Sequence, residues 1–237
     1  MVSPIKHLAI IMDGNRRWAK QRGALQLTGY DAGVKALHRA VAAVIEAKIP
    51  ILTVFAFSTE NWRRPSSEVD YLLNTILKNA LNSSAEHFIE YGVKVVWVGR
   101  RDRVSKNLLE QIQNLEQATK NATKLQLNIA LDYGGQWEIV QACQRLLQQI
   151  KHAKLSFESE SDWHQAFSHE LAINAVPPPD LLIRTGGEHR LSNFMLWHLA
   201  YTELYFVDQY WPDFTADTLH QALTWYDSVK RRFGGNI

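Results

Sequence analysis

The stretch His7-Leu-Ala-Ile-Ile-Met-Asp-Gly-Asn-Arg-Arg-Trp18 decides how the rest of the chain is interpreted. Leu8 to Met12 is a short, continuous apolar run of the kind that buried strands show. The run stops at Asp13-Gly-Asn15, a tripeptide that favours a turn. The sequence therefore predicts a buried strand, a tight turn and a segment that can start a helix.

The turn places chemistry at the end of the predicted strand. Asp13 would lie at the carboxyl edge of the sheet, where open α/β sheets bind ligands. Free N–H groups at a helix start, together with Arg16 and Arg17, suit a phosphate. Since a carboxylate repels a phosphate unless a cation lies between them, the combination indicates Mg²⁺. Taken alone, an ordinary turn with a surface aspartate explains the stretch equally well.

The overall composition narrows the classes of protein. A chain of 237 residues, 46% of them hydrophobic, can bury a sizeable core, and we expect a single domain over residues 1–237. A net charge of +2 gives no reason to expect a nucleic-acid partner. The only cysteine, Cys143, excludes an internal disulfide and fits a reducing compartment. Without a signal peptide or a membrane-length apolar run, the sequence predicts a soluble cytoplasmic protein.

Helical and strand patterns alternate along the chain, which predicts an α/β fold with a mainly parallel sheet of about six strands and helices on both faces. The expected strands are Leu8–Met12, Ile51–Phe57, Val93–Val98, Leu125–Leu131, Leu181–Arg184 and Leu204–Val207. After the helix that starts beyond Gly14, the expected helices are Ala32–Lys48, Ser67–Tyr91, Ser105–Ala122, a helix from Gly135 to His152, Trp163–Leu171 and Thr215–Arg232.

Several predicted strands run into loops that contain Gly, Asn, Asp or Arg. Because parallel strands end at the same edge, we expect one cleft formed by Asp13, Ser58, Asn61, Arg64, Arg184 and Arg190. Several guanidinium groups with few carboxylates suit one or two diphosphates. Glu203 is a candidate for a second metal oxygen. Each arginine alone is better explained as a surface ion pair, and we interpret Arg100 to Arg103 as surface.

The motifs of other ligand classes are absent. Neither G-x-G-x-x-G nor G-x-x-x-x-G-K-[ST] occurs, so nothing indicates dinucleotide or P-loop nucleotide binding. The hydrolase motif G-x-S-x-G is also missing. The nine histidines do not form H-E-x-x-H, and only His189 stays open as a ligand.

Seven blocks of sequence together resemble the cis-prenyltransferase family, and within it the bacterial undecaprenyl diphosphate synthases. The blocks span nearly the whole chain in family order: Met12–Ala19, Ala56–Trp62 with Arg64, Asn128–Gly135, Ile183–Phe194, Glu203–Phe206, Trp211-Pro212 and Arg231–Gly235.

The resemblance implies a Mg²⁺-dependent prenyltransferase that is a homodimer. Farnesyl diphosphate loses its diphosphate and is attacked by isopentenyl diphosphate, and the cycle repeats to undecaprenyl (C55) diphosphate, the lipid carrier precursor for bacterial cell-wall polysaccharide. It also allows a peripheral membrane contact for product release. The alternatives left open are a non-catalytic partner subunit of the same fold and an enzyme with a different product length.

The resemblance also implies roles for individual residues. Asp13 is the essential acid and holds Mg²⁺, with Glu203 supplied by the neighbouring subunit. Asn61 assists proton removal. The allylic diphosphate pocket contains Gly14, Asn15, Arg16, Arg17 and Trp18; Ser58, Thr59, Glu60, Trp62 and Arg64 surround the substrates; and Arg184, Arg190, Leu191 and Ser192 form the isopentenyl diphosphate site.

An apolar tunnel would hold the growing chain between the helix Ser67–Tyr91 and the strand faces around Ala56 and Leu127–Leu131. At about 0.8 kcal/mol per buried CH₂, each five-carbon unit gains roughly 3–4 kcal/mol there. The same residues also fit an ordinary core. The terminal Arg232-x-Gly234 resembles the family element that reaches the partner's site.

One departure from the family pattern concerns the diphosphate pocket. The family has Arg and His where this chain has Gln26 and Tyr30, which can donate hydrogen bonds but carry no positive charge. We therefore predict weaker binding of the allylic diphosphate, or a shifted set of contacts.

Overall fold

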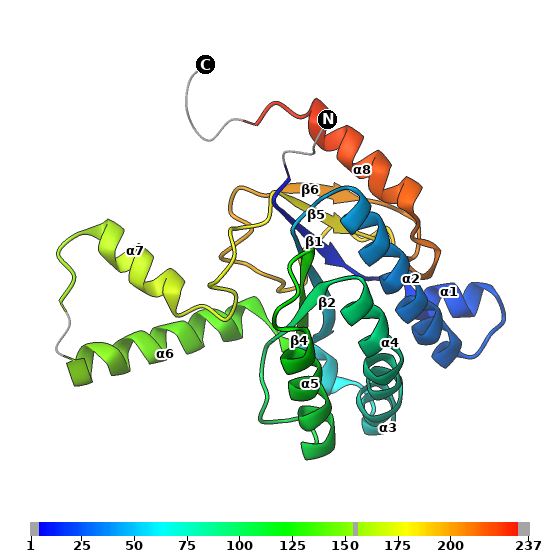
Figure 1. Cartoon of the computed structure of the whole chain (residues 1–237), viewed down its shortest axis with the longest axis horizontal. Helices are drawn as coiled ribbons and strands as arrows, with labels where there is room; N and C mark the ends of the chain where they lie inside the picture. Colours follow the sequence, from blue (N-terminus) through cyan, green and yellow to red (C-terminus); the bar gives the residue numbers. More distant parts are fainter. Residues whose placement is uncertain (1–4, 154–155, 232–237) are drawn as a thin grey trace.

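The computed structural model describes residues 5–153 and 156–231, which form a six-stranded, all-parallel sheet in the order β3-β4-β2-β1-β5-β6 (Figure 1). This confirms the predicted α/β architecture. The strands are β1 His7–Ile11, β2 Ile51–Ser58, β3 Val93–Val98, β4 Leu125–Tyr133, β5 Leu181–Arg184 and β6 Glu203–Phe206.

Helices connect the strands and differ from the predicted ranges mainly at their ends. They are α1 Asn15–Gln21, α2 Gln26–Glu46, α3 Ser66–Tyr71, α4 Lys78–Glu90, α5 Lys106–Thr119, α6 Gly135–Ala153, α7 Glu160–His169 and α8 Ala216–Ser228. Short helical turns are η1 Thr59–Arg63, η2 Leu72–Leu77 and η3 Trp211–Asp213. No helix within residues 5–153 and 156–231 is long and apolar enough to cross a membrane.

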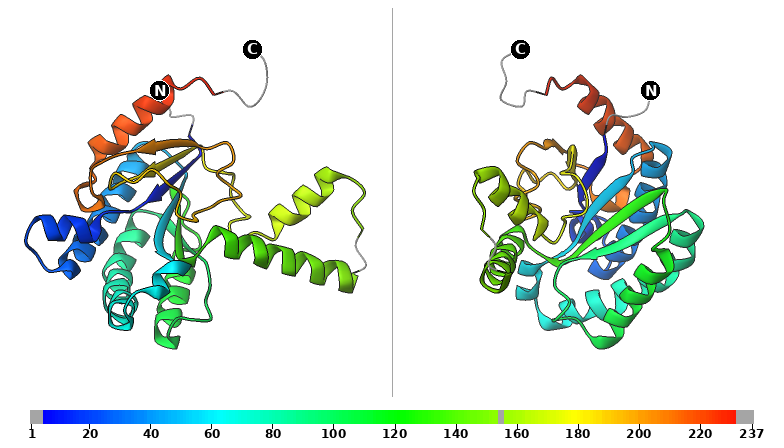
Figure 2. Two further views of the ribbon diagram at one scale, coloured as in Figure 1. Left: turned by 180° about the vertical axis from the view of Figure 1, so that it is seen from behind. Right: turned by 60° about the vertical axis from the view of Figure 1, so that its left-hand side comes forward.

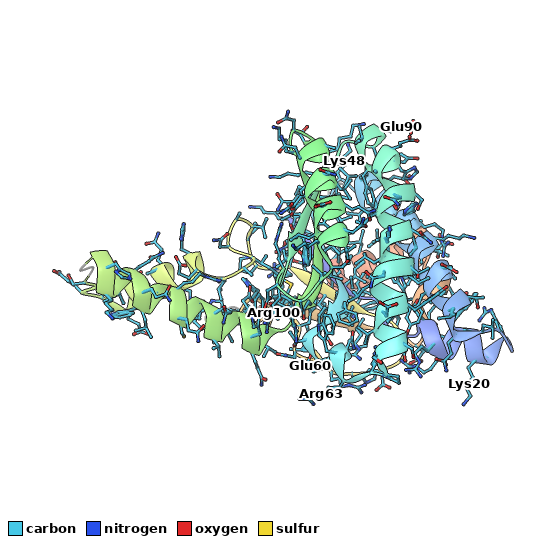
Figure 3. The ribbon with its side chains drawn as sticks, turned by 90° about the horizontal axis from the view of Figure 1, so that it is seen from below. Lys20, Lys48, Glu60, Arg63, Glu90 and Arg100 are labelled. Atoms are coloured by element: carbon cyan, nitrogen blue, oxygen red, sulfur yellow. The ribbon has the colours of Figure 1, made fainter. Side chains whose placement is uncertain are left out.

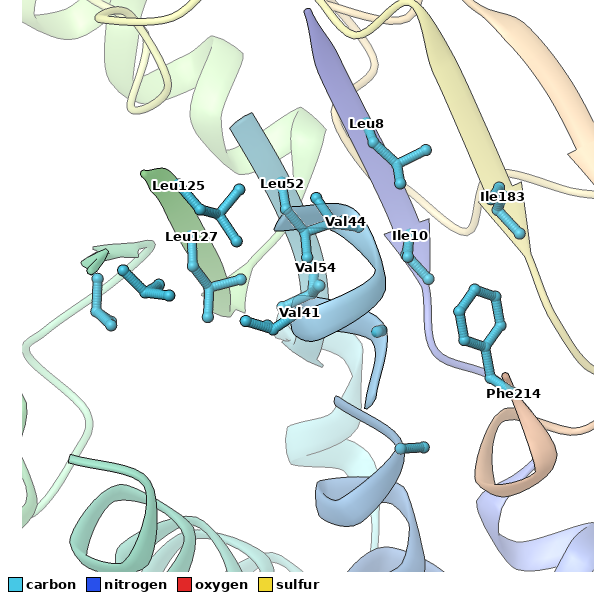
Figure 4. Close-up of a cluster of buried hydrophobic side chains, with 14 of the residues drawn as sticks. Leu8, Ile10, Val41, Val44, Leu52, Val54, Leu125, Leu127, Ile183 and Phe214 are labelled. Atoms are coloured by element: carbon cyan, nitrogen blue, oxygen red, sulfur yellow. The ribbon is translucent and has the colours of Figure 1, made fainter. Parts of the chain in front are cut away.

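β1 lies inside the sheet, with β2 and β5 as its neighbours, and all five of its residues are buried. This is why Leu8 to Ile11 are continuously apolar rather than alternating, and why buried His7 has its ring nitrogens paired with Pro177 and Thr53. On one face, Leu8 and Ile10 join the larger core together with residues of α2, α4, α5 and α8, and Figure 4 shows part of this cluster. Ala9 and Ile11 point to a smaller core on the other face.

That second face is covered mainly by loop residues between α7 and β6 and by the start of α6. The rest of α6 runs away from the sheet and forms with α7 an arm beside the body of the molecule, as two views show (Figures 1 and 2). α7 has no buried residue, and Trp163 on it is 46% exposed.

The predicted helix Ser67–Tyr91 is continuous but not uniform. α3, η2 and α4 follow one another without a break, because Tyr71, Leu77 and Lys78 all have right-handed helical backbone angles. η2 is a π-helical segment, a rare geometry that is frequent at functional sites.

α2 begins at Gln26, six residues earlier than predicted. Its first turns are mostly polar, so the apolar spacing from Val34 onward could not reveal them. They are held by packing, because Gly29 and Gly33 lie directly against Asn15 of α1.

Candidate active site

The turn after β1 is built by the neighbouring loops. Gly14 has φ +107°, in the left-handed region, and a Cβ there would lie 2.6 Å from the Tyr210 side chain. The Asp13 carbonyl accepts hydrogen bonds from the Trp211 N–H at 2.9 Å and from the Thr185 hydroxyl at 2.8 Å. These contacts fix the turn that carries the Asp13 side chain at the carboxyl end of β1.

The Asp13 carboxylate lies between two guanidinium groups. It accepts from Arg17 at 3.0 Å and from Arg184 at 2.9 Å. Arg184 is only 3% exposed and also donates to the Ser192 hydroxyl at 2.8 Å and to the Arg190 carbonyl. The planar guanidinium of Arg184, buried and held by fixed acceptors, is preorganised to donate to the oxygens of an anion such as a phosphate.

The Glu188 carboxylate links two arginines of the cleft, Arg17 and Arg190. It accepts from Arg17 at 3.4 Å and pairs with Arg190, whose side chain is 60% exposed. Arg17 therefore touches both Asp13 and Glu188, and positive and negative groups alternate along the rim.

A second charged group lies on the opposite side of the cleft. Glu68 on α3 accepts from Arg64 at 3.2 Å, from the Tyr30 hydroxyl at 3.1 Å and from Arg16 at 3.5 Å. Tyr30 also accepts from Arg64 at 3.1 Å. Burial raises the pKa of Tyr30, so its hydroxyl stays protonated and can donate to Glu68. Gln26 lines the same cleft.

η1 carries two polar side chains into the cleft. The Asn61 side-chain oxygen accepts the Ser58 N–H at 3.0 Å, which caps η1. Glu60 accepts from Asn193 at 2.8 Å. Burial opposes ionisation of Glu60, but hydrogen bonds from Asn193 and its neighbours lower the pKa of that carboxyl overall.

The charged rim is the mouth of a cavity of about 1110 Å³ whose inner walls are apolar. η2 and α4 form one wall, and β2 and β4 contribute Ala56, Ile129 and Leu131 to the other. The helical wall contains Leu72, Leu73, Ile76, Leu77, Ala80, Leu81 and Phe88. The cavity therefore has a polar, cationic mouth and a hydrocarbon-lined interior.

The structure brings most of the predicted site residues to this one cleft, although they come from distant parts of the sequence. The predicted residues that line it are Asp13, Gly14, Asn15, Arg16, Arg17, Ser58, Glu60, Asn61, Arg64, Arg184, Arg190 and Ser192.

Four predicted substrate residues lie behind the cleft lining instead. The Trp18 indole donates to Asp213 at 2.7 Å, which fixes α1 to η3, and the Trp62 indole donates to Asp132 at 2.8 Å. The Thr59 hydroxyl donates to Glu60 at 3.0 Å, and Leu191 packs against the smaller core. These four residues are adjacent in sequence to cleft residues, but their side chains contact the structure that supports the cleft.

Glu203 does not supply a second metal oxygen to the cleft of its own chain. It begins β6, where it pairs in register with Leu181, whereas Arg184 at the other end of β5 contacts Asp13. Since β5 and β6 are parallel, the carboxyl end of β6, and not Glu203, faces the cleft. Arg103 lies at the surface as predicted, and its guanidinium also pairs with the buried carboxylate of Asp132.

Sequence reasoning missed several cleft residues. Lys20 follows Arg16 by one helical turn and lines the mouth. Figure 3 shows it extending from the same edge as Glu60. The i, i+4 spacing could have indicated it. Gln136 and Asn193 carry no comparable signal, because long-range packing brings them to the cleft, and the same holds for Glu68, which holds the cleft residues Arg64 and Tyr30 from behind the lining.

The donor set around Asp13 fits a divalent cation that is shared with a substrate. Within residues 5–153 and 156–231, no three His, Cys, Asp or Glu side chains are grouped so as to hold a metal alone. Mg²⁺ is commonly bound by one or two carboxylates together with substrate phosphates, and Asp13 amid arginines matches that pattern.

A parallel α/β sheet whose carboxyl edge carries this cationic rim above apolar walls has the shape and charge that suit an anionic group attached to a hydrocarbon chain. Comparison with known proteins agrees. Residues 11–234 match a family described as "Putative undecaprenyl diphosphate synthase", and the chain belongs to this prenyltransferase family.

Curated relatives and solved structures support the assignment over the whole chain. An undecaprenyl diphosphate synthase of Coxiella burnetii, named as farnesyl-diphosphate specific, is 45% identical over 97% of this chain and 95% of its own. An isoprenyl transferase of Oceanobacillus iheyensis is 44% identical over 97% of this chain and 90% of its own.

Among solved structures, lavandulyl diphosphate synthase from Lavandula x intermedia, in complex with dimethylallyl diphosphate, has a TM-score of 0.91 at 32% identity and 98% coverage of both chains. A probable undecaprenyl diphosphate synthase from Campylobacter jejuni has a TM-score of 0.80 at 31% identity, covering 98% of this chain and 99% of its own.

Proposed function

We propose that this chain catalyses cis-prenyl chain elongation, in which isopentenyl diphosphate is added repeatedly to farnesyl diphosphate to give undecaprenyl (C55) diphosphate. The observation that carries the proposal is the continuity of the site. A rim of guanidinium groups around Asp13 and an apolar interior form one continuous cavity of about 1110 Å³. The farnesyl-diphosphate-specific synthase of Coxiella burnetii, at 45% identity, supports the same substrate.

The arginines supply the main electrostatic contribution. As the allylic carbon–oxygen bond breaks, negative charge develops on the departing diphosphate, and fixed donors stabilise it without reorganisation. We assign Arg16, Arg17 and Arg64 to the allylic diphosphate, and Arg184 and Arg190 to isopentenyl diphosphate. Arg17 lies between the two groups, because it shares Asp13 with Arg184 and Glu188 with Arg190.

Asn61 acts as a donor in this proposal. Its side-chain oxygen already accepts the Ser58 N–H, so the amide N–H₂ is the part that can hold a substrate oxygen. Asn61 therefore orients isopentenyl diphosphate for attack and for loss of its proton, and is not itself the base.

We also propose that the enzyme uses Mg²⁺ held by Asp13 and the substrate. The bound ion would neutralise charge on the diphosphate. In the free protein, Arg17 and Arg184 already pair with Asp13, so the carboxylate is held in place for this role.

The growing lipid would occupy the cavity between α4 and the sheet. Its walls are leucine, isoleucine and phenylalanine side chains. Each added five-carbon unit gains roughly 3–4 kcal/mol by leaving water, which supports retention of the intermediate between cycles.

A homodimer is part of the proposal, with Glu203 acting in the partner's site. The support is the outer strand β6 and the residues just before it, where Tyr201 is 72% exposed and Leu204 is 37% exposed. Arg232 and Gly234, expected to reach the partner's site, lie outside the described residues. Light scattering of wild type and Leu204→Glu tests the dimer.

Location and release of product complete the proposal. The exposed Cys143 suits a reducing compartment, consistent with a cytoplasmic enzyme. A peripheral membrane contact would receive the long apolar product. Sedimentation with vesicles in the presence and absence of substrates tests it.

The deciding experiment combines purified chain, Mg²⁺, farnesyl diphosphate and radiolabelled isopentenyl diphosphate. We expect butanol-extractable label that migrates as a C55 product on chromatography. A shorter or longer product would assign a different chain length.

The alternative of a non-catalytic partner subunit rests on Gln26 and Tyr30, which bring no charge to the pocket. No extractable label, from protein that is folded and dimeric, would favour that alternative.

A further inference from the structure

The side of η1 that faces away from the cleft contacts a charged pair, Asp132 and Arg103, which has no assigned role in substrate binding. Trp62 is the residue after Asn61, and its side chain turns away from the cleft. Its indole N–H donates to Asp132 at 2.8 Å, and its ring packs edge-on against Phe57, with centroids 5.7 Å apart. Because Trp62 adjoins Asn61 in η1, the position of Asn61 depends on the position of Asp132.

Asp132 occupies an irregular place at the end of β4. The register pairs Phe57 with Leu131 and Ser58 with Tyr133, which leaves Asp132 without a ladder partner. Asp132 has φ +50°, unusual for a residue other than glycine, and is 1% exposed. Bulges of this kind re-aim side chains beside active sites, and such backbone strain persists only where the surroundings impose it.

Arg103 holds the other side of the carboxylate. Its Nε donates to Asp132 at 2.8 Å, and a second guanidinium nitrogen donates to the other carboxylate oxygen. The same guanidinium lies over the Trp62 ring, 4.9 Å from its centroid. Arg103 thus contacts both members of the Trp62–Asp132 pair, through a bidentate ion pair and a cation–π contact.

We propose that Arg103 and Asp132 are positioning residues for the reaction, which set η1 through Trp62 and so place the Asn61 amide over the cleft. The inference rests on the proposed prenyltransferase function and assigns part of its machinery to residues that do not line the cleft. On the cleft side, Glu60 is held by Asn193 at 2.8 Å, so η1 is fixed from the front and from behind.

The chain contains a matched control. Arg101 makes a bidentate pair with Glu116, at 2.8 and 3.0 Å, and lies 5.1 Å from the centroid of the Trp97 ring. Its side chain is 40% exposed, against 32% for Arg103. The chemistry is the same, but Trp97 belongs to the outer strand β3 and does not adjoin the cleft.

The test compares Arg103→Gln with Arg101→Gln in the dimeric enzyme under saturating substrates. Because a misplacement of about 1 Å can cost up to 10²-fold in rate, we expect Arg103→Gln to lower kcat about 10- to 100-fold. The KM for farnesyl diphosphate should stay near that of wild type, since the arginines of the rim are untouched. Arg101→Gln should stay within about threefold in kcat, as expected for a partly exposed ion pair.

A double-mutant cycle separates positioning from stability. If Arg103 acts through Trp62, Arg103→Gln should cost no further kcat in a Trp62→Phe background, with all rates given per folded protein. Arg103→Lys keeps the charge but loses the bidentate geometry, so it should restore only part of the rate.

Additive losses in the cycle, or a lowered Tm with unchanged kcat in Arg103→Gln, would overturn the inference. An inactive wild type would instead refute the proposed function, so the two failures are distinguishable.

Discussion

Replacing Arg184 with lysine gives the sharpest test of the cleft as a diphosphate site. The Arg184 guanidinium donates to Asp13 at 2.9 Å, to Ser192 at 2.8 Å and to the Arg190 carbonyl. It is 3% exposed, and its Nε has no partner among the described residues. A lysine ammonium keeps the charge but is a single point, which can reach one of these acceptors and not all three.

The structure gives the size of the expected loss. Two hydrogen bonds to a charged group disappear, at about 1.5–3 kcal/mol each, so up to about 3–6 kcal/mol is at stake. If the lost hydrogen-bond free energy raises the activation free energy by the same amount, kcat/KM for isopentenyl diphosphate falls about 10²- to 10⁴-fold, because each tenfold change corresponds to 1.36 kcal/mol.

The assay is steady-state incorporation of radiolabelled isopentenyl diphosphate, with Tm measured in parallel. Arg145→Lys is the control, because Arg145 is paired with Glu170, outside the cleft. A loss of less than about threefold in kcat/KM for Arg184→Lys, with unchanged Tm, would refute the reasoning.

Four further predictions concern other parts of the molecule. Changing Gln26→Arg together with Tyr30→His should lower the KM for farnesyl diphosphate by adding charge to the pocket, and an unchanged KM would show that those positions do not limit binding. His7 is fully buried, and burial lowers its pKa from 6.5 to about 4. The contribution of neutral His7 to the free energy of unfolding is therefore complete above pH 6.5 and is lost as the pH falls through 4. The loss is about 3 kcal/mol, at 1.36 kcal/mol per unit of pKa shift. In denaturant titrations, the free energy of unfolding should fall more between pH 7 and pH 4 for wild type than for His7→Gln. An equal fall in the two proteins would contradict this prediction. Because two arginines pair with Asp13, Mg²⁺ alone should bind weakly, and calorimetry should show tighter Mg²⁺ binding once a diphosphate is present. Tight binding to the free enzyme would speak against this. Truncation after Lys230 should strongly reduce turnover, and full activity of the shortened chain would exclude a catalytic role for the last residues.

The buried strands were predictable because parallel strands covered on both sides need continuous apolar sequence. All six predicted strands exist, each within two residues of its expected ends. Helix ends were less predictable. α2 begins in polar residues that only the packing of Gly29 and Gly33 against Asn15 supports. The π-helical segment η2 likewise leaves no trace in the apolar spacing.

The residue types of the site were predictable, but the direction of each side chain was not. Asp13 and Arg184 follow strands that end at one edge, so their meeting follows from strand direction alone. Trp18 and Trp62 stand in the same motifs, yet their indoles turn to Asp213 and Asp132 behind the cleft. Side chains on a single helical turn point in different directions, and sequence adjacency cannot say which direction faces a ligand.

The sequence by itself therefore determined the parallel α/β fold and the cationic character of its carboxyl edge, because both depend on local patterns repeated strand by strand. The tertiary structure alone decided that Glu203 stands at the far end of β6, that Glu68 and Tyr30 hold Arg64, and that Arg103 reaches Asp132 behind η1. These pairings join residues from separate elements, and their geometry is set by how helices and loops pack on the sheet.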